Sequence, residues 1–205
     1  MTVTILFVSE NNDKYLELKS YLDKTDYKNN INLVKIKPHE DIEEIQSLDR
    51  NKIIFRKLLD SYQSIKEIIQ HTYNNNEIYL MVEDTSLCID KQCGLPGPFI
   101  KFYLKLQSLS KISYDNWGSP TQSIVTLGIC KINKSGLIHS QHIFEGLING
   151  VIVKEQGENG FGFDPIFKPN GSSCTNASMS INEKAIYNPR IKAFQQVLSF
   201  ILPSL

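Results

Sequence analysis

Two adjacent carboxylates, Glu83 and Asp84, directly follow the short apolar run 78–82. The run is typical of a buried strand, and carboxylates at the carboxyl end of such a strand lie in the usual ligand crevice of an α/β sheet. Paired acids suit a hard cation such as magnesium, which keeps several waters and bridges to phosphates. The alternative is a solvated strand end. A tight turn at 94–98, with two glycines and two prolines, follows closely and favours a functional site.

Another apolar run, 3–8, is followed by a polar loop that contains Ser9 and Asn11, with Lys14 shortly after. A strand, a polar loop and a helix in this order direct helix N-terminal amides at an anion. The Asn11 amide and the Lys14 ammonium could both bind phosphate oxygens. The alternative is that Ser9 or Asn11 caps the helix while Lys14 is solvated. The loop does not match a Walker P-loop, which disfavours kinases and GTPases.

The segment 160–167 alternates glycine with aromatic residues and contains Asp164. Exposed ring faces can stack on a planar base, and glycine allows close backbone approach. Asp164 could accept hydrogen bonds from the base or position a cation. The alternative is an apolar plug that closes a sheet edge. Further along the chain, Lys184 and Arg190 could recognise phosphates or base carbonyls, or could be surface charges.

The composition is that of an ordinary globular protein. Its 205 residues, 41% hydrophobic and 21% charged, suit one large domain or one domain with two lobes. Lys and Arg (22) balance Asp and Glu (22), which argues against a broad nucleic-acid-binding surface but allows a local anion pocket. Four cysteines without a Cys-x-x-Cys pair predict reduced thiols. The sequence shows neither a signal peptide nor a run of roughly 20 apolar residues, so we expect a cytoplasmic protein.

Hydrophobic periodicity predicts a mixture of strands and helices. The predicted strands are 3–8, 31–36, 78–82, 123–132, 137–144 and 151–154. The predicted helices are 12–24, 49–71, 98–109 and 189–202, and the segment 157–171 is predicted to be an ordered loop. We expect 123–132 and 137–144 to be antiparallel neighbours. The mixed order predicts an α/β protein with a mixed sheet.

Four segments, in their order along the chain, resemble the motifs of the inosine triphosphate pyrophosphatase family, which clears non-standard purine nucleoside triphosphates such as ITP, dITP and XTP. Residues 9–17 are similar to its opening Thr/Ser-x-Asn-x-x-Lys-x-x-Glu motif. Residues 82–87 and 94–101 are similar to its central signature, especially in the eukaryotic form. Residues 144–152 resemble its Phe-x-Gly…Gly-x-Ile strand pair, and 160–167 its Gly-Phe-Gly-Tyr/Trp-Asp-Pro-x-Phe loop.

The resemblance extends over nearly the whole chain and implies a single domain, 1–205. This α/β domain would have two lobes around an elongated mixed β-sheet flanked by helices, with an active-site cleft between the lobes. The implied reaction gives a nucleoside monophosphate and pyrophosphate, with magnesium as cofactor and manganese as a substitute. The implied partners are a small-molecule nucleotide and a second copy of the chain; no nucleic acid or membrane is expected.

The resemblance also implies roles for individual residues. Asp84 would be catalytic and would bind magnesium, with Glu44, or Glu43 in an alternative register, as the second carboxylate. Lys14 would also be catalytic. The residues implied to hold the triphosphate are Ser9, Asn11, Lys14 and Lys57. The residues implied to contact the nucleotide and its base are Thr85, Lys101, Phe161, Gly162, Phe163, Asp164, Lys184 and Arg190. A water activated by the metal and a nearby carboxylate would attack the α-phosphorus.

Two positions depart from the family pattern. Glu10 stands where the family has a small residue, and it adds a negative charge near the expected phosphates. Asn188-Pro189-Arg190 replaces Ser-His-Arg, so the arginine is retained while the serine and histidine are not. Two further hypotheses therefore stay open: a pyrophosphatase with a different base preference, and a catalytically weak nucleotide-binding protein.

Overall fold

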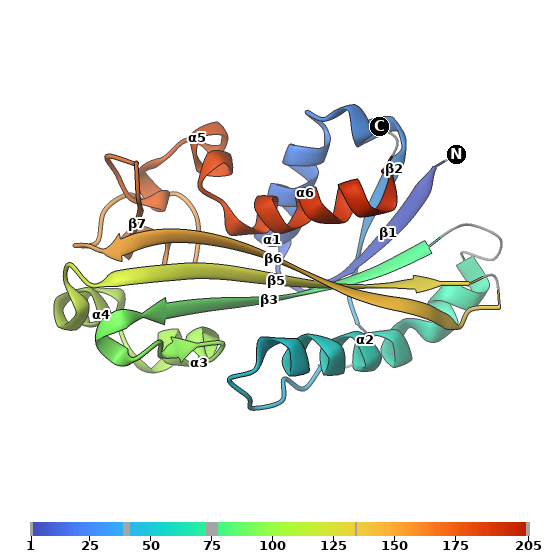
Figure 1. Ribbon diagram of the computed structural model, residues 1–205, viewed down its shortest axis with the longest axis horizontal. Coiled ribbons are helices and arrows are strands. Elements are labelled where there is room, and N and C mark those ends of the chain that lie inside the picture. Colours follow the sequence, from blue (N-terminus) through green and yellow to red (C-terminus); the bar gives the residue numbers. More distant parts are fainter. Residues whose placement is uncertain (1, 39–41, 73–77, 134, 204–205) are drawn as a thin grey trace. The chain divides into compact units, whose positions relative to one another are not determined.

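A computed structural model of the chain describes residues 2–38, 42–72, 78–133 and 135–203 (Figure 1). The chain forms two compact units, each built from several segments. Unit 1 comprises Met1–Asp84, Thr126–Phe144 and Ala193–Leu205, and unit 2 comprises Thr85–Val125 and Glu145–Lys192. Within the described ranges, no helix is both long enough and apolar enough to cross a membrane.

The described strands form a seven-stranded mixed sheet in the order β2-β1-β3-β5-β6-β7, with β4 paired to β3. They are β1 (Val3–Val8), β2 (Ile31–Ile36), β3 (Ile78–Ile89), β4 (Pro96–Gly97), β5 (Pro120–Ile132), β6 (Ile138–Ile152) and β7 (Phe167–Pro169). β1 is parallel to β2 and β3, whereas β4 is antiparallel to β3 and β7 to β6. β5 and β6 are antiparallel neighbours, as expected (Figure 1). The predicted α/β class with a mixed sheet is confirmed.

The helices are α1 (Asn12–Leu22), α2 (Arg50–Thr72), α3 (Ile100–Leu106), α4 (Leu109–Asn116), α5 (Ile181–Ile186) and α6 (Pro189–Ile201). The predictions of α1, α2 and α6 are confirmed to within two residues at each end. The predicted helix 98–109 is wrong, because the chain forms two helices there. Ser108 accepts a hydrogen bond from the backbone N–H of Lys111 and so caps a new helix, α4. α5 was not predicted.

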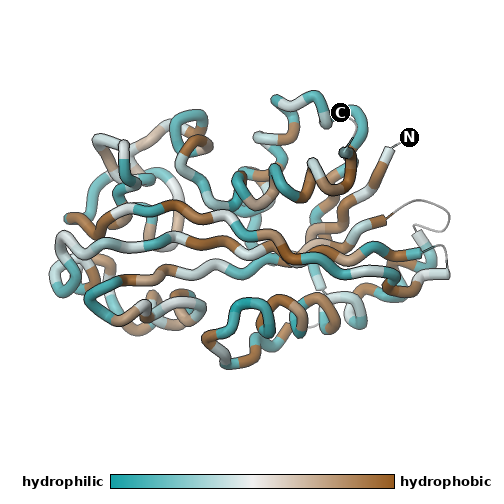
Figure 2. Tube along the Cα trace, in the orientation of Figure 1, coloured by the Kyte–Doolittle hydropathy of each residue, from teal (hydrophilic) through white to brown (hydrophobic). Residues whose placement is uncertain are grey.

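In unit 1, the amphipathic helix α2 buries its apolar side against the sheet, and apolar and polar segments alternate along it (Figure 2). Ile54 and Leu58 belong to the same cluster as Leu80 and Val82 of β3. The contact is tight because Gly128 of β5 has no side chain: a Cβ there would lie 2.3 Å from Ile54 Cγ2. Leu80 and Val82 of β3 therefore face α2.

The prediction that a strand ends at the acidic pair is wrong. β3 continues through Glu83 and Asp84 and ends at Ile89. Its last part pairs with β4, in register Leu87↔Gly97, so the Gly-Pro turn folds back on the strand that precedes it. Because this pairing partner lies later in the chain, the local pattern around the acids does not reveal it.

The two strands predicted at 137–144 and 151–154 form one continuous strand, β6. Gly150, which lies just before the second predicted strand, is inside β6 and pairs with β7. A Cβ on Gly150 would lie 2.5 Å from the carbonyl oxygen of Lys168, so this glycine permits the close approach of a neighbouring strand. The predicted loop 157–171 contains that strand and a short 3-10 helix, η3 (Asp164–Ile166).

Candidate active site

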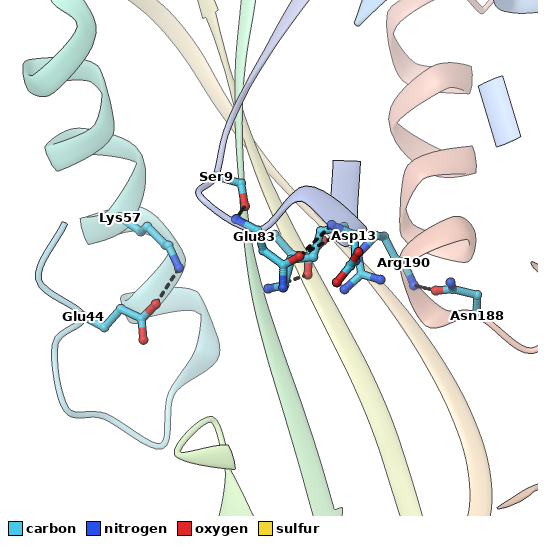
Figure 3. A network of polar contacts seen from close by, with 9 residues as sticks. Ser9, Asp13, Glu44, Lys57, Glu83, Asn188 and Arg190 are labelled. Carbon is cyan, nitrogen blue, oxygen red and sulfur yellow. Dashed lines mark hydrogen bonds and ion pairs between the residues drawn. The ribbon is translucent and has the colours of Figure 1, made fainter. Parts of the chain in front are cut away.

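The loop between β1 and α1 is held by hydrogen bonds to its own side chains. Ser9 Oγ accepts from the backbone N–H of Asn11 at 3.2 Å. Asn11 Oδ1 accepts from the N–H groups of Asp13 and Lys14 at 2.8 and 3.2 Å, so Asn11 is the N-cap of α1 (Figure 3). The structure thus shows the helix cap that was one of the two predictions for Asn11. It is compatible with anion binding, because it fixes the loop at a helix N-terminus, where the amides favour negative charge.

Glu10, which departs from the family motif in this loop, lies beside a cation. Its Oε1 is 3.5 Å from Lys37 Nζ, and both side chains are well exposed. An exposed pair of this kind contributes little to stability. It does offset part of the negative charge that Glu10 adds near the expected phosphates.

Glu83 and Asp84 point to opposite faces of β3, because successive strand residues alternate. Val82 packs against α2, so Asp84 shares the α2 face and Glu83 lies on the other. Glu83 is almost fully buried, and its Oε1 forms an ion pair with Lys14 Nζ at 3.0 Å (Figure 3). The two acids are therefore separate carboxylates with different partners rather than one paired site.

Asp84 is a buried carboxylate with an unsatisfied oxygen. It is 7% exposed, and its Oδ2 accepts no hydrogen bond from the part of the chain that the structure describes. Burial raises the pKa of Asp84 from its usual 3.8 to about 6, and Glu44 and Glu83 also raise it, whereas Lys57 and Lys14 lower it. Buried acceptors are normally paired, so this oxygen has the character of a cation ligand.

Lys57 of α2 and Glu44, which precedes that helix, form an ion pair with 2.8 Å between Nζ and Oε1 (Figure 3). Both side chains are largely buried, at 16% and 19% exposed. Both also act on the pKa of Asp84. The neighbouring Glu43 is exposed and acts instead on Arg56. The geometry thus favours Glu44 over Glu43 as the second carboxylate.

These carboxylates fit a magnesium ion. In the described ranges, no three His, Cys, Asp or Glu side chains converge as a metal cage. Magnesium does not require one, because it is usually held by one or two carboxylates together with water and substrate phosphates. Asp84 offers a buried oxygen without a donor, and Glu44 offers a carboxylate close enough to raise the pKa of Asp84.

In unit 2, two cationic side chains lie over one aromatic ring. Lys184 Nζ is 5.0 Å and Arg190 Cζ is 5.5 Å from the centroid of Phe161, both within cation–π range. Phe161 is half-buried, so part of its ring remains accessible. A ring face beside hydrogen-bond donors could stack on a planar base and bind its carbonyl oxygens.

Phe161 and Phe163 have different surroundings in the structure. Phe163 belongs to the apolar core of unit 2 and meets Phe167 edge to face, with centroids 6.2 Å apart. Its ring fills the core as the plug interpretation proposed, and a contact of Phe163 with the nucleotide stays a prediction. Gly162, between Phe161 and Phe163, is exposed and has φ +63°, a conformation that glycine adopts readily.

Two further candidates lie in other elements of unit 2. Thr85 is half-buried in β3, and Lys101 is exposed in the first turn of α3. Their contacts with the nucleotide stay predictions.

The departure at Asn188-Pro189-Arg190 is explained by the start of α6. The backbone N–H of Arg190 donates to Asn188 Oδ1 at 2.9 Å (Figure 3). Pro189 is the first residue of the helix. Asparagine as N-cap and proline in the first helical position are both favoured. The substitution therefore retains the helix start and the buried Arg190.

Asn176 is a buried residue that was not predicted to belong to the site. This residue is 3% exposed, and its Nδ2 donates to Asp164 Oδ1 at 3.3 Å. It lies twelve positions from Asp164 and outside the four segments that resemble the family motifs, so the sequence did not indicate its contact with Asp164. The role of Glu83 as the partner of Lys14 was missed as well, although the residue itself was noted.

Comparison with known proteins agrees with this architecture. Residues 5–200 match the family described as the Ham1 family. An inosine triphosphate pyrophosphatase from Candida glabrata is 36% identical over 203 residues, covering 96% of each chain, and one from Saccharomyces cerevisiae is 33% identical, covering 96% of this chain and 95% of that one. The structure of a HAM1 protein from Coxiella burnetii has a TM-score of 0.71 at 20% identity, covering 99% of this chain and all of that one. The Coxiella protein thus shares the fold of this chain, and the sequence matches show that this chain belongs to the Ham1 family.

Proposed function

We propose that this chain is a magnesium-dependent pyrophosphatase that hydrolyses non-standard purine nucleoside triphosphates, such as ITP, dITP and XTP, to the monophosphate and pyrophosphate. One observation carries the proposal: the buried carboxylate of Asp84, with an oxygen that lacks a donor, lies among the charges of Lys57, Glu44 and Lys14. Such a cluster suits a triphosphate and its metal ion. The relatives named inosine triphosphate pyrophosphatase support the choice of substrate.

Unit 1 would bind the triphosphate. Lys14 and Lys57 would each bring an ammonium group to phosphate oxygens, and the N-terminal amides of α1 near Asn11 would add donors. Both lysines are already oriented, at 3.0 Å from Glu83 and 2.8 Å from Glu44 respectively. Donors placed in advance need little reorganisation during the reaction, and such electrostatic preorganisation is usually the largest catalytic contribution.

Magnesium held by Asp84 and Glu44 would neutralise phosphate charge and lower the pKa of a coordinated water. Asp84 must be ionised for this role, and its pKa of about 6 allows that at neutral pH. Attack of water on the α-phosphorus would break the bond between the α- and β-phosphates. The lysines would then stabilise the charge that develops on the leaving pyrophosphate.

Unit 2 would bind the base. The Phe161 ring would stack on the purine, while Lys184 and Arg190 would supply hydrogen bonds. Both cations are donors only, so they match the 6-oxo group of hypoxanthine and xanthine and cannot accept a hydrogen bond from the 6-amino group of adenine.

The proposal is tested by measuring pyrophosphate release from ITP, dITP, XTP, ATP, GTP and dUTP with magnesium, and again with manganese or EDTA. We expect release from the inosine and xanthosine nucleotides, loss of release in EDTA, and recovery with either metal. The matched control is Asp84→Asn, which retains the side-chain shape but loses the charge. Failure of the wild-type protein to release pyrophosphate from ITP or XTP would reject the proposal.

A second candidate is a pyrophosphatase with a broader base preference. Pro189, immediately before Arg190, has no side-chain hydrogen-bonding group with which to discriminate among bases. Comparable kcat/KM values for ITP, GTP and ATP in the same panel would favour this candidate. Tight binding of all nucleotides without release would favour a nucleotide-binding protein of weak activity.

We also propose that the protein is a homodimer, as the family resemblance implies, and that it is cytoplasmic, as expected from a sequence without a signal peptide or a long apolar run. Its four cysteines are free, which suits a reducing compartment. Light scattering during size-exclusion chromatography would test the assembly, and a mass of one chain at micromolar concentration would contradict it. Cell fractionation would test the compartment.

A further inference from the structure

The carboxylate of Asp164 is fully engaged inside unit 2. Its Oδ2 accepts hydrogen bonds from Lys184 Nζ at 2.8 Å and from the backbone N–H of Phe161 at 3.0 Å. Its Oδ1 accepts one from Asn176 Nδ2 at 3.3 Å. Asp164 is only 7% exposed. A carboxylate that already holds three donors is suited to orienting them, rather than to meeting a base directly.

The nitrogen and the oxygen of the Asn176 side-chain amide differ in their hydrogen bonding. Nδ2 donates to Asp164, whereas Oδ1 is buried and accepts no hydrogen bond from any described residue. The opposite amide orientation would place an acceptor against the carboxylate, so the chemistry of the pair supports this assignment. A buried acceptor without a donor lowers stability, and an apolar side chain of similar size would avoid that cost. The amide group therefore serves the contact with Asp164.

Gly160 confines the same carboxylate from another direction. A Cβ on Gly160 would lie 2.3 Å from Asp164 Oδ2, and the backbone there has φ +86°. Oδ2 thus packs closely against backbone, while Oδ1 is oriented by the Asn176 amide. The terminal torsion of aspartate is intrinsically broad, so such contacts are needed to hold the carboxylate in one orientation.

We propose that Asn176 is a positioning residue for base recognition. It orients Asp164, and Asp164 holds the Lys184 ammonium over the Phe161 ring, where Nζ lies 5.0 Å from the centroid. The inference rests on the proposed function, because that function assigns Lys184 and Phe161 to the base. The inference adds Asn176, which would act on the base only through Asp164 and Lys184.

The test compares Asn176→Leu with a control in the same turn, Thr175→Val. Thr175 is fully buried, and its hydroxyl bonds to the carbonyl oxygen of Gln156 at 2.8 Å and to Ser178 Oγ at 3.0 Å, rather than to Asp164. We expect Asn176→Leu to raise KM for ITP about tenfold, the usual effect of losing a hydrogen bond to a charged group. The value of kcat should stay within about threefold, because the base is bound alike in the ground and transition states. Thr175→Val should lower the urea midpoint and leave KM unchanged.

A second readout does not depend on turnover. Calorimetry with IMP and with inorganic tripolyphosphate separates binding of the base from binding of the phosphates. Asn176→Leu should weaken IMP binding about tenfold and leave tripolyphosphate binding unchanged. Asn176→Asp, which retains the shape but faces Asp164 with a second negative charge, should weaken IMP binding further.

The results separate the inference from the proposed function. Wild-type protein that releases no pyrophosphate would reject the function, and IMP binding would still decide the role of Asn176. A folded Asn176→Leu protein with wild-type KM and IMP affinity would overturn the inference. A loss of IMP affinity in Thr175→Val as large as that in Asn176→Leu would overturn the inference too, because the effect would then come from the turn as a whole.

Discussion

Replacing Asp84 with asparagine should stabilise the metal-free protein while removing its activity. Burial raises the pKa of Asp84 from 3.8 to about 6. The folded state therefore favours the neutral acid and is penalised wherever the carboxylate is ionised. The Asp84→Asn side chain has nearly the same shape and stays neutral at every pH, so it avoids the penalty.

The magnitude follows from proton binding. A carboxyl group whose pKa is raised by folding stabilises the folded state fully only at a pH below its unfolded pKa, which is about 3.9 for Asp. This stabilisation is lost as the pH rises through the folded pKa, and the loss is the penalty on the ionised form. A rise from 3.8 to about 6, at about 1.4 kcal/mol per unit, corresponds to about 3 kcal/mol above pH 7. At pH 4.5 about 1 kcal/mol of the penalty remains. The stability advantage of Asp84→Asn should therefore grow from about 1 kcal/mol at pH 4.5 to about 3 kcal/mol at pH 8.

The assay is urea unfolding in EDTA at both pH values, followed by far-UV circular dichroism. Glu83→Gln is the matched control, because it neutralises the adjacent carboxylate. Glu83 is paired with Lys14 at 3.0 Å, so this variant should be less stable than the wild type at pH 8. Adding magnesium should stabilise the wild type and Glu83→Gln but not Asp84→Asn, since the ion would bind the ionised Asp84 of the folded state.

Two results would refute the reasoning. The first is an Asp84→Asn protein that is less stable than the wild type at pH 8 without metal. The second is a difference that does not change with pH, because ionisation would then not be its cause. In the presence of magnesium, turnover of ITP by the variant should fall at least about a hundredfold, and near-wild-type rates would remove Asp84 from the mechanism.

Three more outcomes are expected. Gly128→Ala should lower the free energy of unfolding by about 2 kcal/mol, because its Cβ would lie 2.3 Å from Ile54 Cγ2; an unchanged urea midpoint would contradict the packing. Phe161→Ala should raise KM for ITP about tenfold through loss of stacking, and steady-state kinetics showing no change would exclude a role in base binding. Lys57→Met, which removes the partner of Glu44, should weaken tripolyphosphate binding about tenfold by calorimetry, and equal affinity would place the phosphates elsewhere.

Elements with a strong local signal were predictable from the sequence. The predicted strands 3–8 and 31–36 are the strands β1 and β2, residue for residue. The helical periodicity of 49–71 and 189–202 agrees with α2 and α6 to within one residue at each end. Each of these segments carries its own hydrophobic pattern, so no distant partner is needed to recognise it.

Strands that are lengthened by pairing with a segment far away in the sequence were not predictable in this way. β3 passes through Glu83 and Asp84 because later segments of the chain pair with it, and β6 passes through Gly150 because β7 approaches closely there. In both places, the polar or glycine residues indicated a break when considered alone. Backbone pairing overrode that local signal.

The sequence by itself determined which chemical groups are available: the acids and lysines of unit 1, and the aromatic loop and cations of unit 2. The tertiary structure decided how they are used. Strand alternation and burial separate Glu83 from Asp84, so that one is paired with Lys14 and the other has an oxygen that no described residue meets with a donor. Packing buries Phe163 and brings Asn176 to Asp164. Contacts of this kind depend on backbone pairing and on distances between residues far apart in the chain, which a linear pattern of residues does not specify.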